Sequence, residues 1–427
     1  MTVSHPARTE KTAGTPPDRV ELPATRPFTF EFDVYLVLAV AALLALGLMM
    51  VFSTTFDWSY QVFGSPTKIF LRQLRSLAVG VVALVVLARI DYHLTRRLAV
   101  PIIALTVVAL VVLLALPNTE AFGARRSFFK GSIQPGEAAK LAVVIYLAAW
   151  LAARGRNIRK ITYGLLPFSA LVGAVCGLIV LEPDLSTAAI IFATAWTLFF
   201  LAGADIFQLL VSAGLASGVG FVLMLNFSYA RERLALHWQA VNDLTTASWH
   251  VQQAVIAFTA PGRDPLNPDK PNWFGVGLGQ SSQKFGFLPA PHTDSIFAVI
   301  GEELGLFGTL VVIALYVAFV YRGITIVRKA ADPYGALLAS GITLWIATEA
   351  ILNVAVMTAV LPFSGVPLPF ISYGGSSLVT ALAGVGLLIN VSRTRVYQAP
   401  RRTRADYTVG RRDRGGRISR VGRRRGA

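Results

Sequence analysis

The feature that most constrains this chain is a series of long apolar segments, each close to the length that crosses a lipid bilayer. A spanning helix takes about 20 mostly apolar residues, because lipid offers the backbone no hydrogen-bond partners. The 427-residue chain is 54% hydrophobic and 15% charged, whereas soluble domains carry about 25% charged residues. The sequence therefore predicts an all-α integral membrane protein and excludes a water-soluble globule.

Ten segments fit this description, which predicts about ten transmembrane helices. They are residues 34–53, 76–90, 98–116, 138–153, 161–181, 187–203, 206–226, 295–320, 336–360 and 375–392. The second segment is the weakest, because its apolar core is short and Arg89 follows it. Nine or eleven spans are the alternatives.

Three regions follow from this pattern. Residues 1–27 are polar and contain no hydrophobic signal segment, which predicts a disordered cytoplasmic N-terminus. Residues 28–396 form the polytopic membrane domain, with a large outer loop at 228–294 between the seventh and eighth helices. Residues 397–427 are rich in Arg and Gly, which predicts a disordered basic tail. Such a tail favours anionic lipid as its ligand, and we expect no nucleic-acid partner.

The orientation is predicted from the basic residues. Most of the 39 Lys and Arg residues fall on one side if ten spans begin with the N-terminus inside. Positive charge is retained in the cytoplasm. We therefore expect both termini in the cytoplasm of a cell with an inner, cytoplasmic membrane, and the outer loops on its extracytoplasmic face.

Unusual polar residues gather in the outer segments. Ionisable residues beside a membrane are costly, so they indicate either function or a structural ion pair. A transporter would place such residues near the bilayer midplane, whereas one-sided placement favours chemistry on a lipid-linked molecule at the outer interface. The first candidates are Arg125 and Arg126, Glu137 and Lys140, and Glu182 and Asp184.

Each of these pairs also has a structural explanation. Glu137 and Lys140 lie three residues apart, on one face of a helix, and could pair with each other. Asp184 stands at a helix start, where a carboxylate serves as a cap. Arg125 and Arg126 suit an anionic phosphate, or they could be solvated loop residues.

The largest group of candidate residues lies where the large outer loop ends and the next helix begins. Asp294 is the best candidate for a general base, because a Pro-bounded turn places it where the chain re-enters the bilayer and desolvation can tune its basicity. The alternative is an N-cap of the following helix. At least one of Glu302 and Glu303 should point into the bundle and need a partner such as Lys284. The other candidates here are Arg233, His292 and Thr293.

Two irregular segments accompany these residues. The glycines of 274–280 are a weak phosphate-binding signal and favour a tight turn beside the membrane. Residues 361–377 hold three prolines between two apolar runs, so they should line a cavity, where irregular backbone is tolerated. Ser376 lies at the end of this segment and is a further candidate for substrate binding.

With these motifs the chain resembles the SEDS family (shape, elongation, division and sporulation), the FtsW/RodA/SpoVE group. The most specific matches are His292-Thr-Asp294 with the following Ile296 to Gly305, and Gly365 to Ser377. The resemblance covers about residues 34–395. Phe370 and the basic tail favour the division branch, FtsW, over the elongation branch. Within the resemblance, an insertion at 261–271 interrupts a stretch that the family keeps rich in glycine.

The resemblance implies a peptidoglycan glycosyltransferase that polymerises lipid II, inverts the donor sugar and releases undecaprenyl pyrophosphate. Asp294 matches the family's essential acidic residue, and Arg125, Arg126, Lys140 and Lys284 could stabilise the pyrophosphate. A divalent cation, Mg²⁺ or Mn²⁺, could assist, although the sequence shows no dedicated metal site. The resemblance also implies a class B penicillin-binding protein and other division or elongation proteins as partners. Alternatives are a lipid II flippase, supported by Glu349 and Asn353 in the ninth span, and a noncatalytic division scaffold.

Overall fold

The computed structural model describes residues 32–116, 128, 134–242, 246–259 and 273–393. In this part of the chain the regular elements are helices, as predicted. Seven are long and apolar enough to cross a membrane: α1 (Val34–Phe63), α2 (Lys68–Arg89), α5 (Pro135–Arg154), α8 (Ile206–Asn226), α11 (Ile296–Lys329), α12 (Pro333–Met357) and α13 (Gly375–Arg393).

Shorter helices complete the described part. Three are apolar: α4 (Ala99–Ala115), α6 (Leu165–Leu181) and α7 (Leu185–Leu201). The others are α3 (His93–Arg97), η1 (Gly155–Arg159), α9 (Ser228–Asn242) and α10 (Trp249–Thr259). Each of the ten predicted segments coincides with a long or short apolar helix, while the number of spans stays a prediction. The large outer loop carries α9 and α10, which periodicity did not indicate.

Three helices are longer than the apolar segments that predicted them. α1 continues past residue 53 to Phe63, α2 begins at Lys68, and α11 ends at Lys329. The predictions stopped where polar residues appeared, but a helix that leaves the hydrocarbon keeps its backbone hydrogen bonds in a polar layer. These extensions place residues of α1 beside the outer loop.

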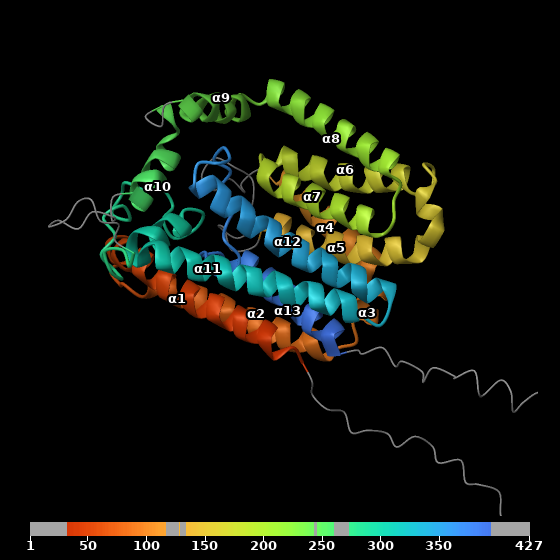
Figure 1. Cartoon of the computed structure of the whole chain (residues 1–427), viewed down its shortest axis with the longest axis horizontal. Coiled ribbons are helices and arrows are strands. Elements are labelled where there is room, and N and C mark those ends of the chain that lie inside the picture. Colours follow the sequence, from red (N-terminus) through yellow and green to blue (C-terminus); the bar gives the residue numbers. More distant parts are fainter. Residues whose placement is uncertain (1–31, 117–127, 129–133, 243–245, 260–272, 394–427) are drawn as a thin grey trace, which may run out of the picture. The chain divides into compact units, whose positions relative to one another are not determined.

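Helices α2 and α13 pack along each other at close range (Figure 1). A Cβ on Gly80 would lie 2.6 Å from Leu382, and one on Gly386 would lie 2.6 Å from the backbone of Leu84. Small residues let membrane helices approach each other this closely. On the other side of the bundle, α12 packs against α5, α7 and α11, which brings their polar residues together.

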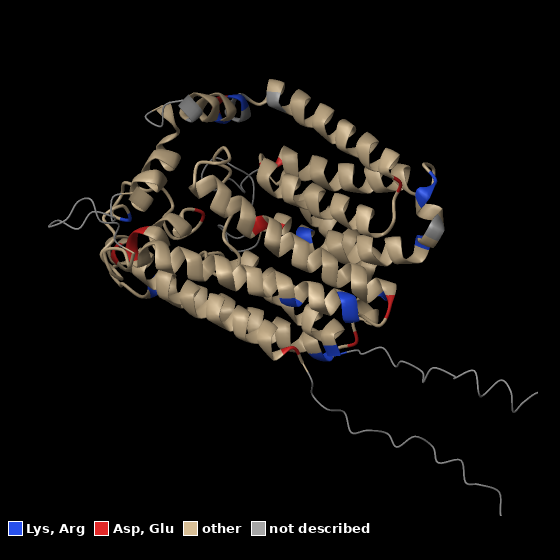
Figure 2. Ribbon diagram, in the orientation of Figure 1, with Lys and Arg blue, Asp and Glu red and all other residues tan. Residues whose placement is uncertain are grey.

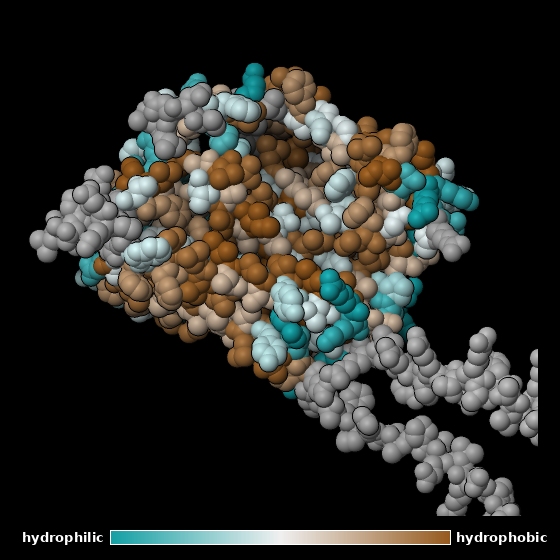
Figure 3. Space-filling view, in the orientation of Figure 1, coloured by the Kyte–Doolittle hydropathy of each residue, from teal (hydrophilic) through white to brown (hydrophobic). Residues whose placement is uncertain are grey.

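Helix α8 lies apart from α11 and α12 and crosses over α6 and α7 (Figure 1). Most of its residues are exposed. The space-filling view shows a hollow beneath α8 and α9 whose walls are largely hydrophobic (Figure 3). A hollow of this kind, open at the side of the bundle, could admit the apolar chain of a lipid.

Charged residues are distributed unevenly between the two ends of the bundle. Figure 2 shows most of the described Lys and Arg residues at the end formed by α3, η1 and the last turns of α11 and α13. The opposite end carries α9, α10 and the turn before α11. We call this opposite end the site end, since the candidate residues described below lie there.

Candidate functional site

Asp294 lies in the turn that precedes α11, and its side chain is partly buried. One carboxylate oxygen, Oδ1, accepts a hydrogen bond of 2.6 Å from the Thr293 hydroxyl. The other, Oδ2, lies 3.3 Å from the position that a Cβ on Gly365 would take. The N-cap of α11 is Ser295, so the alternative that Asp294 caps this helix is wrong. The carboxylate of Asp294 is therefore not used to cap α11.

The backbone of this turn is held at three consecutive carbonyl groups, those of residues 292–294. Each accepts a hydrogen bond from α12 or from the irregular segment 361–374. The donors are the Tyr373 amide (2.8 Å), the Ser372 hydroxyl (2.5 Å) and the Asn353 side-chain amide (2.8 Å). The position of Asp294 is therefore determined by residues far away in the sequence.

Asn353 links the turn to the irregular segment. Its side-chain nitrogen also donates a hydrogen bond of 2.7 Å to the carbonyl of Val366, and the side chain is buried. The sequence analysis placed Asn353 in the ninth span as support for a transport path. In the structure its amide bonds instead to the backbone that carries Asp294.

His292 lies between two aromatic rings. Its imidazole stacks on Trp58 of α1 with centroids 4.9 Å apart and meets the Tyr373 ring edge-on at 5.6 Å. Burial lowers the pKa of His292 to about 4, because a charged ring would lose its hydration. His292 is therefore neutral at physiological pH and cannot serve as a cation for a phosphate. Trp58 lies beyond the predicted end of the first span, which is why the sequence did not indicate it.

The starts of α5, α7 and α13 meet the segment 361–374 close to Asp294. The Gln134 amide, just before α5, donates to the Ser376 hydroxyl of α13 at 3.3 Å. The Ser186 hydroxyl of α7 donates to the carbonyl of Ser364. Helix N-termini carry partial positive charge, but Glu137 lies in the first turn of α5 and Asp184 caps α7, so acidic groups offset this charge at two of the three helix starts.

Asp184 and Glu182 lie at the start of α7. Asp184 is the N-cap of this helix and accepts hydrogen bonds from the Thr187 amide at 3.1 Å and the Thr187 hydroxyl at 2.9 Å. The capping alternative for Asp184 is thus observed. Glu182 is buried beside Pro183, which has a φ of +28°.

Lys140 is buried between two carboxylates. Its Nζ lies 2.7 Å from Glu137, three residues earlier on α5, and it also forms an ion pair with Glu349 of α12. The pairing of Glu137 with Lys140 was predicted as one alternative, whereas Glu349 was not foreseen as a partner. Because Lys140 is 2% exposed and engaged on both sides, it stabilises the packing of α5 on α12.

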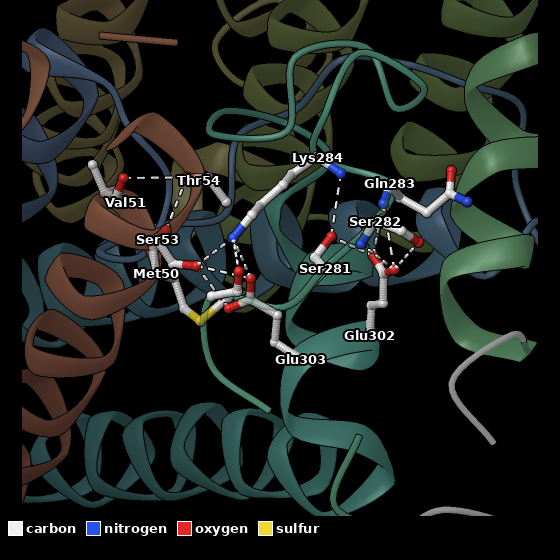
Figure 4. Close-up of polar contacts among 11 residues, drawn as sticks. Met50, Val51, Ser53, Thr54, Ser281, Ser282, Gln283, Lys284, Glu302 and Glu303 are labelled. Atoms are coloured by element: carbon white, nitrogen blue, oxygen red, sulfur yellow. Dashed lines mark hydrogen bonds and ion pairs between the residues drawn. The ribbon is translucent and has the colours of Figure 1, made fainter. Parts of the chain in front are cut away.

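Glu302 and Glu303 both hold the outer loop, as Figure 4 shows. Glu303 accepts hydrogen bonds from the Ser53 hydroxyl of α1 at 2.8 Å and pairs with Lys284 at 3.0 Å. The carboxylate of Glu302 accepts bonds from the chain at 281–283, including the Ser282 amide at 2.8 Å. The predicted partnership with Lys284 is observed, and both glutamates have structural partners.

Arg233 of α9 lies near the site on its other side. Its guanidinium donates to the carbonyl of Phe363 at 3.3 Å and lies 5.3 Å from the centre of that ring. Together with His237 and Val251, it borders an open depression of about 390 Å³, a volume that includes space open to solvent. The His250 ring lies 4.1 Å from the Phe363 ring, tilted by 33°, and burial lowers the pKa of His250. Among the described residues that line this depression, Arg233 supplies a permanent positive charge.

Several predicted residues lie outside the part that the structure describes. Arg125 and Arg126 fall in 117–127, and the insertion at 261–271 falls in 260–272. Among the described residues, no group of three His, Cys, Asp or Glu side chains could hold a metal ion.

Comparisons with known proteins agree with this arrangement. The family model described as "Cell cycle protein", for FtsW, RodA and SpoVE, matches residues 34–397. The chain is 36% identical over 372 residues to a probable peptidoglycan glycosyltransferase FtsW from Trichlorobacter lovleyi, covering 86% of this chain and 95% of that protein. It is also 36% identical over 370 residues to stage V sporulation protein E from Bacillus subtilis, covering 86% and 98%.

Two solved structures have a similar fold. One is the rod shape determining protein RodA of Thermus thermophilus, with a TM-score of 0.62 and 26% identity, covering 87% of this chain and 100% of that one. The other comes from work on structural coordination of polymerization and crosslinking by a peptidoglycan synthase complex, with a TM-score of 0.67 and 27% identity, covering 86% and 99%. The likeness extends over the whole membrane domain.

Proposed function

Because the chain belongs to the FtsW/RodA/SpoVE family of cell cycle proteins, we propose that it is a peptidoglycan glycosyltransferase that polymerises lipid II. The observation that carries the assignment of a catalytic residue is the turn at Asp294. Its carboxylate is held beside Gly365, and the carbonyls of residues 292–294 are all bonded. A general base has to be fixed in this way relative to its substrate.

In the proposed reaction, Asp294 takes the proton from the 4-hydroxyl of the acceptor sugar. The hydroxyl oxygen attacks the anomeric carbon of the lipid-linked donor, and the bond to the pyrophosphate breaks with inversion. The electron pair of that bond leaves with undecaprenyl pyrophosphate. A sugar hydroxyl is a weak nucleophile until its proton is removed, so the carboxylate supplies what the substrate lacks.

The departing pyrophosphate needs positive charge. We assign part of this to Arg233 and to the N-terminus of α13. Arg125 and Arg126 remain candidates for the same task. Lys140 and Lys284 are less suited, because carboxylates already engage them in the structure. Mg²⁺ or Mn²⁺ bound to the pyrophosphate oxygens could add charge there.

We further propose that the site end faces the outside of the cytoplasmic membrane and that both termini are cytoplasmic. The gathering of Lys and Arg at the other end of the bundle supports this orientation (Figure 2). The hydrophobic hollow beneath α8 and α9 would receive the lipid chain of the substrate from the side (Figure 3). Division is the favoured role, since the relatives include several proteins named FtsW.

A class B penicillin-binding protein is the proposed partner. A structure similar to this chain was described as part of a peptidoglycan synthase complex that coordinates polymerization and crosslinking. A transpeptidase would crosslink the glycan strand as soon as it is made. A complex of the glycosyltransferase with the transpeptidase would keep the new strand close to the second enzyme. Other division or elongation membrane proteins would bind in the same assembly.

The flippase alternative would need polar groups along a path through the membrane. Its two best candidates are engaged: Glu349 pairs with Lys140, and Asn353 bonds to the backbone at Asp294 and Val366. A noncatalytic scaffold would not require the hydrogen bonds that hold the turn at Asp294. Polymerisation therefore accounts for more of the observed contacts.

The experiment that tests the proposal is polymerisation of purified lipid II by the reconstituted protein with its partner. We expect Asp294→Asn to reduce the rate at least about 100-fold, which is the contribution of a typical general base. The matched control is Asp205→Asn, because Asp205 caps α8 with an exposed side chain and Asn caps equally well. Full activity in Asp294→Asn would exclude Asp294 as the base.

A further inference from the structure

Helices α1 and α11 run side by side and are joined by polar contacts at two levels. At the site end, Ser53 and Lys284 bind Glu303. At the opposite end, the Arg322 guanidinium pairs with the carboxylate of Asp33. The two levels are separated by about 20 residues in each helix, which at 1.5 Å per residue is about 30 Å. This equals the thickness of the hydrocarbon core of a bilayer.

The exposure of residues along α11 changes at the level of Glu303. Residues 295–303 are all buried, whereas outward-facing apolar residues begin just beyond Glu303, with Leu306, Phe307 and Leu310 about half exposed. This exposed strip continues to Tyr321. A side that faces lipid is expected to be apolar and unpaired, so the membrane boundary on the side of Asp294 lies near Glu303.

Residues 273–287 of the outer loop pack against α11 at this boundary, and we call this segment the collar. Its backbone follows the helix: the amides of Val276 and Gly277 donate to the carbonyls of Glu302 and Glu303 at 3.0 Å each, and the Phe307 amide donates to Trp273 at 3.1 Å. A Cβ on Gly305 would lie 2.4 Å from the backbone of Gly275. Only glycine permits this approach, and Gly275, Gly277 and Gly279 all have positive φ.

The outer face of the collar is apolar although it is exposed. Its single charged residue, Lys284, turns inward to Glu303. The large apolar side chains on this surface are Trp273 (55% exposed), Phe274 (69%), Leu278 (50%), Phe285 (54%) and Phe287 (53%), and the uncharged polar residues Gln280 and Ser282 are exposed among them. The Phe274 ring lies 5.8 Å from that of Phe307, which belongs to the lipid-facing strip of α11. Trp and Tyr are enriched at membrane–water interfaces, and Trp273 is such a residue in the collar.

We propose that the collar is a membrane-interface anchor whose partner is the lipid of the leaflet on the side of Asp294. Its aromatic face continues the lipid-facing surface of α11, and its amides at the boundary are bonded to α11 rather than left for water. The anchor fixes the height of the site. Trp58 lies five residues beyond Ser53, about 7 Å above the boundary, and His292 stacks on it. The turn at Asp294 thus lies among the lipid headgroups.

The test measures depth with nitroxide labels on single cysteines, in a Cys176→Ala background because Cys176 is the one native cysteine. The whole protein is reconstituted in vesicles of phosphatidylethanolamine and phosphatidylglycerol. Labels at Leu278→Cys and Phe287→Cys report the collar. Leu310→Cys is the control in lipid, and the exposed Gln61→Cys, near the end of α1, is the control above the boundary.

We expect oxygen to relax both collar labels more than a water-soluble nickel chelate does, as at residue 310, with the reverse at residue 61. Collar labels that behave like residue 61 would overturn the proposal. Spin–spin broadening that grows with protein density would show that a second copy covers the collar, and would overturn it as well. The depth measurement does not depend on polymerisation, so it can fail or succeed independently of the proposed enzymatic activity.

Discussion

The removal of one side chain, Asn353→Ala, gives the sharpest test of how the site is held. The Asn353 amide donates to two backbone carbonyls, at Val366 in a buried bond of 2.7 Å and at Asp294 in a partly buried bond of 2.8 Å. A buried carbonyl that loses its donor costs about 1–3 kcal/mol, and the partly buried one adds less, because water can reach it. This free energy is lost directly at the turn that carries the proposed base.

We expect the turn to relax rather than the whole protein to unfold. A displacement of about 1 Å at a reacting group can lower a rate about 100-fold. The assay is the kcat and KM for lipid II in the reconstituted complex. The expected result is a kcat reduced about 100-fold with little change in KM, because Asn353 contacts the backbone of the base and not the substrate.

Asn390→Ala is the matched control. Asn390 also donates its side-chain amide to two backbone carbonyls, those of Leu87 and Ile90, at the far end of α13. Each variant loses a side-chain amide that donates to two backbone carbonyls, near Asp294 in one case and far from it in the other. A similar loss of thermal stability in both, with a loss of kcat only in Asn353→Ala, supports the reasoning. Equal kcat in the two variants, measured per folded molecule, would refute it.

Three further predictions concern the buried charges and His292. Lys284→Met should lower stability by about 3–5 kcal/mol, because it leaves Glu303 buried without a countercharge; the double variant with Glu303→Gln should recover most of the loss in a thermal unfolding assay in detergent. Lys140→Met should destabilise more than Glu349→Gln, since it leaves two buried carboxylates instead of one buried ion pair, and equal losses in the same assay would contradict this. The folded pKa of His292, about 4, is below its unfolded value of about 6.5. Its contribution to stability is therefore complete above pH 6.5 and is lost as pH falls toward 4. The free energy of unfolding should depend less on pH across this range in His292→Gln, and an unchanged dependence would exclude the effect.

The sequence predicted those parts of the fold that depend on local pattern. Apolar segments of about 20 residues located the helices, since burying a backbone in lipid requires them. The ends of α1 and α2 were missed, because polar residues such as Arg72 and Arg75 end an apolar window without ending a helix. The helices α9 and α10 lie in a loop whose composition gives no clear period.

The candidate site was predicted in the same uneven way. The Pro-bounded turn before α11 indicated Asp294, and the short sequence distance between Lys284 and Glu303 made their pairing foreseeable. The donors that hold Asp294 lie 59 to 79 residues away, and a single sequence does not show which distant residues meet. The pairing of Lys140 with Glu349 spans 209 residues and was missed for the same reason.

That long separation has a consequence for how the protein is made. Synthesis proceeds at about 5–20 residues per second, so α5 waits in the membrane for about 10–40 s before Glu349 emerges. A lone lysine costs about 2.5–3.5 kcal/mol on insertion at the centre of a helix, and less at the position of Lys140, the sixth residue of α5. Glu137, one turn away on the same helix, can neutralise Lys140 during this interval. The chain thereby carries its own temporary counterion, which allows α5 to enter the membrane before its final partner exists.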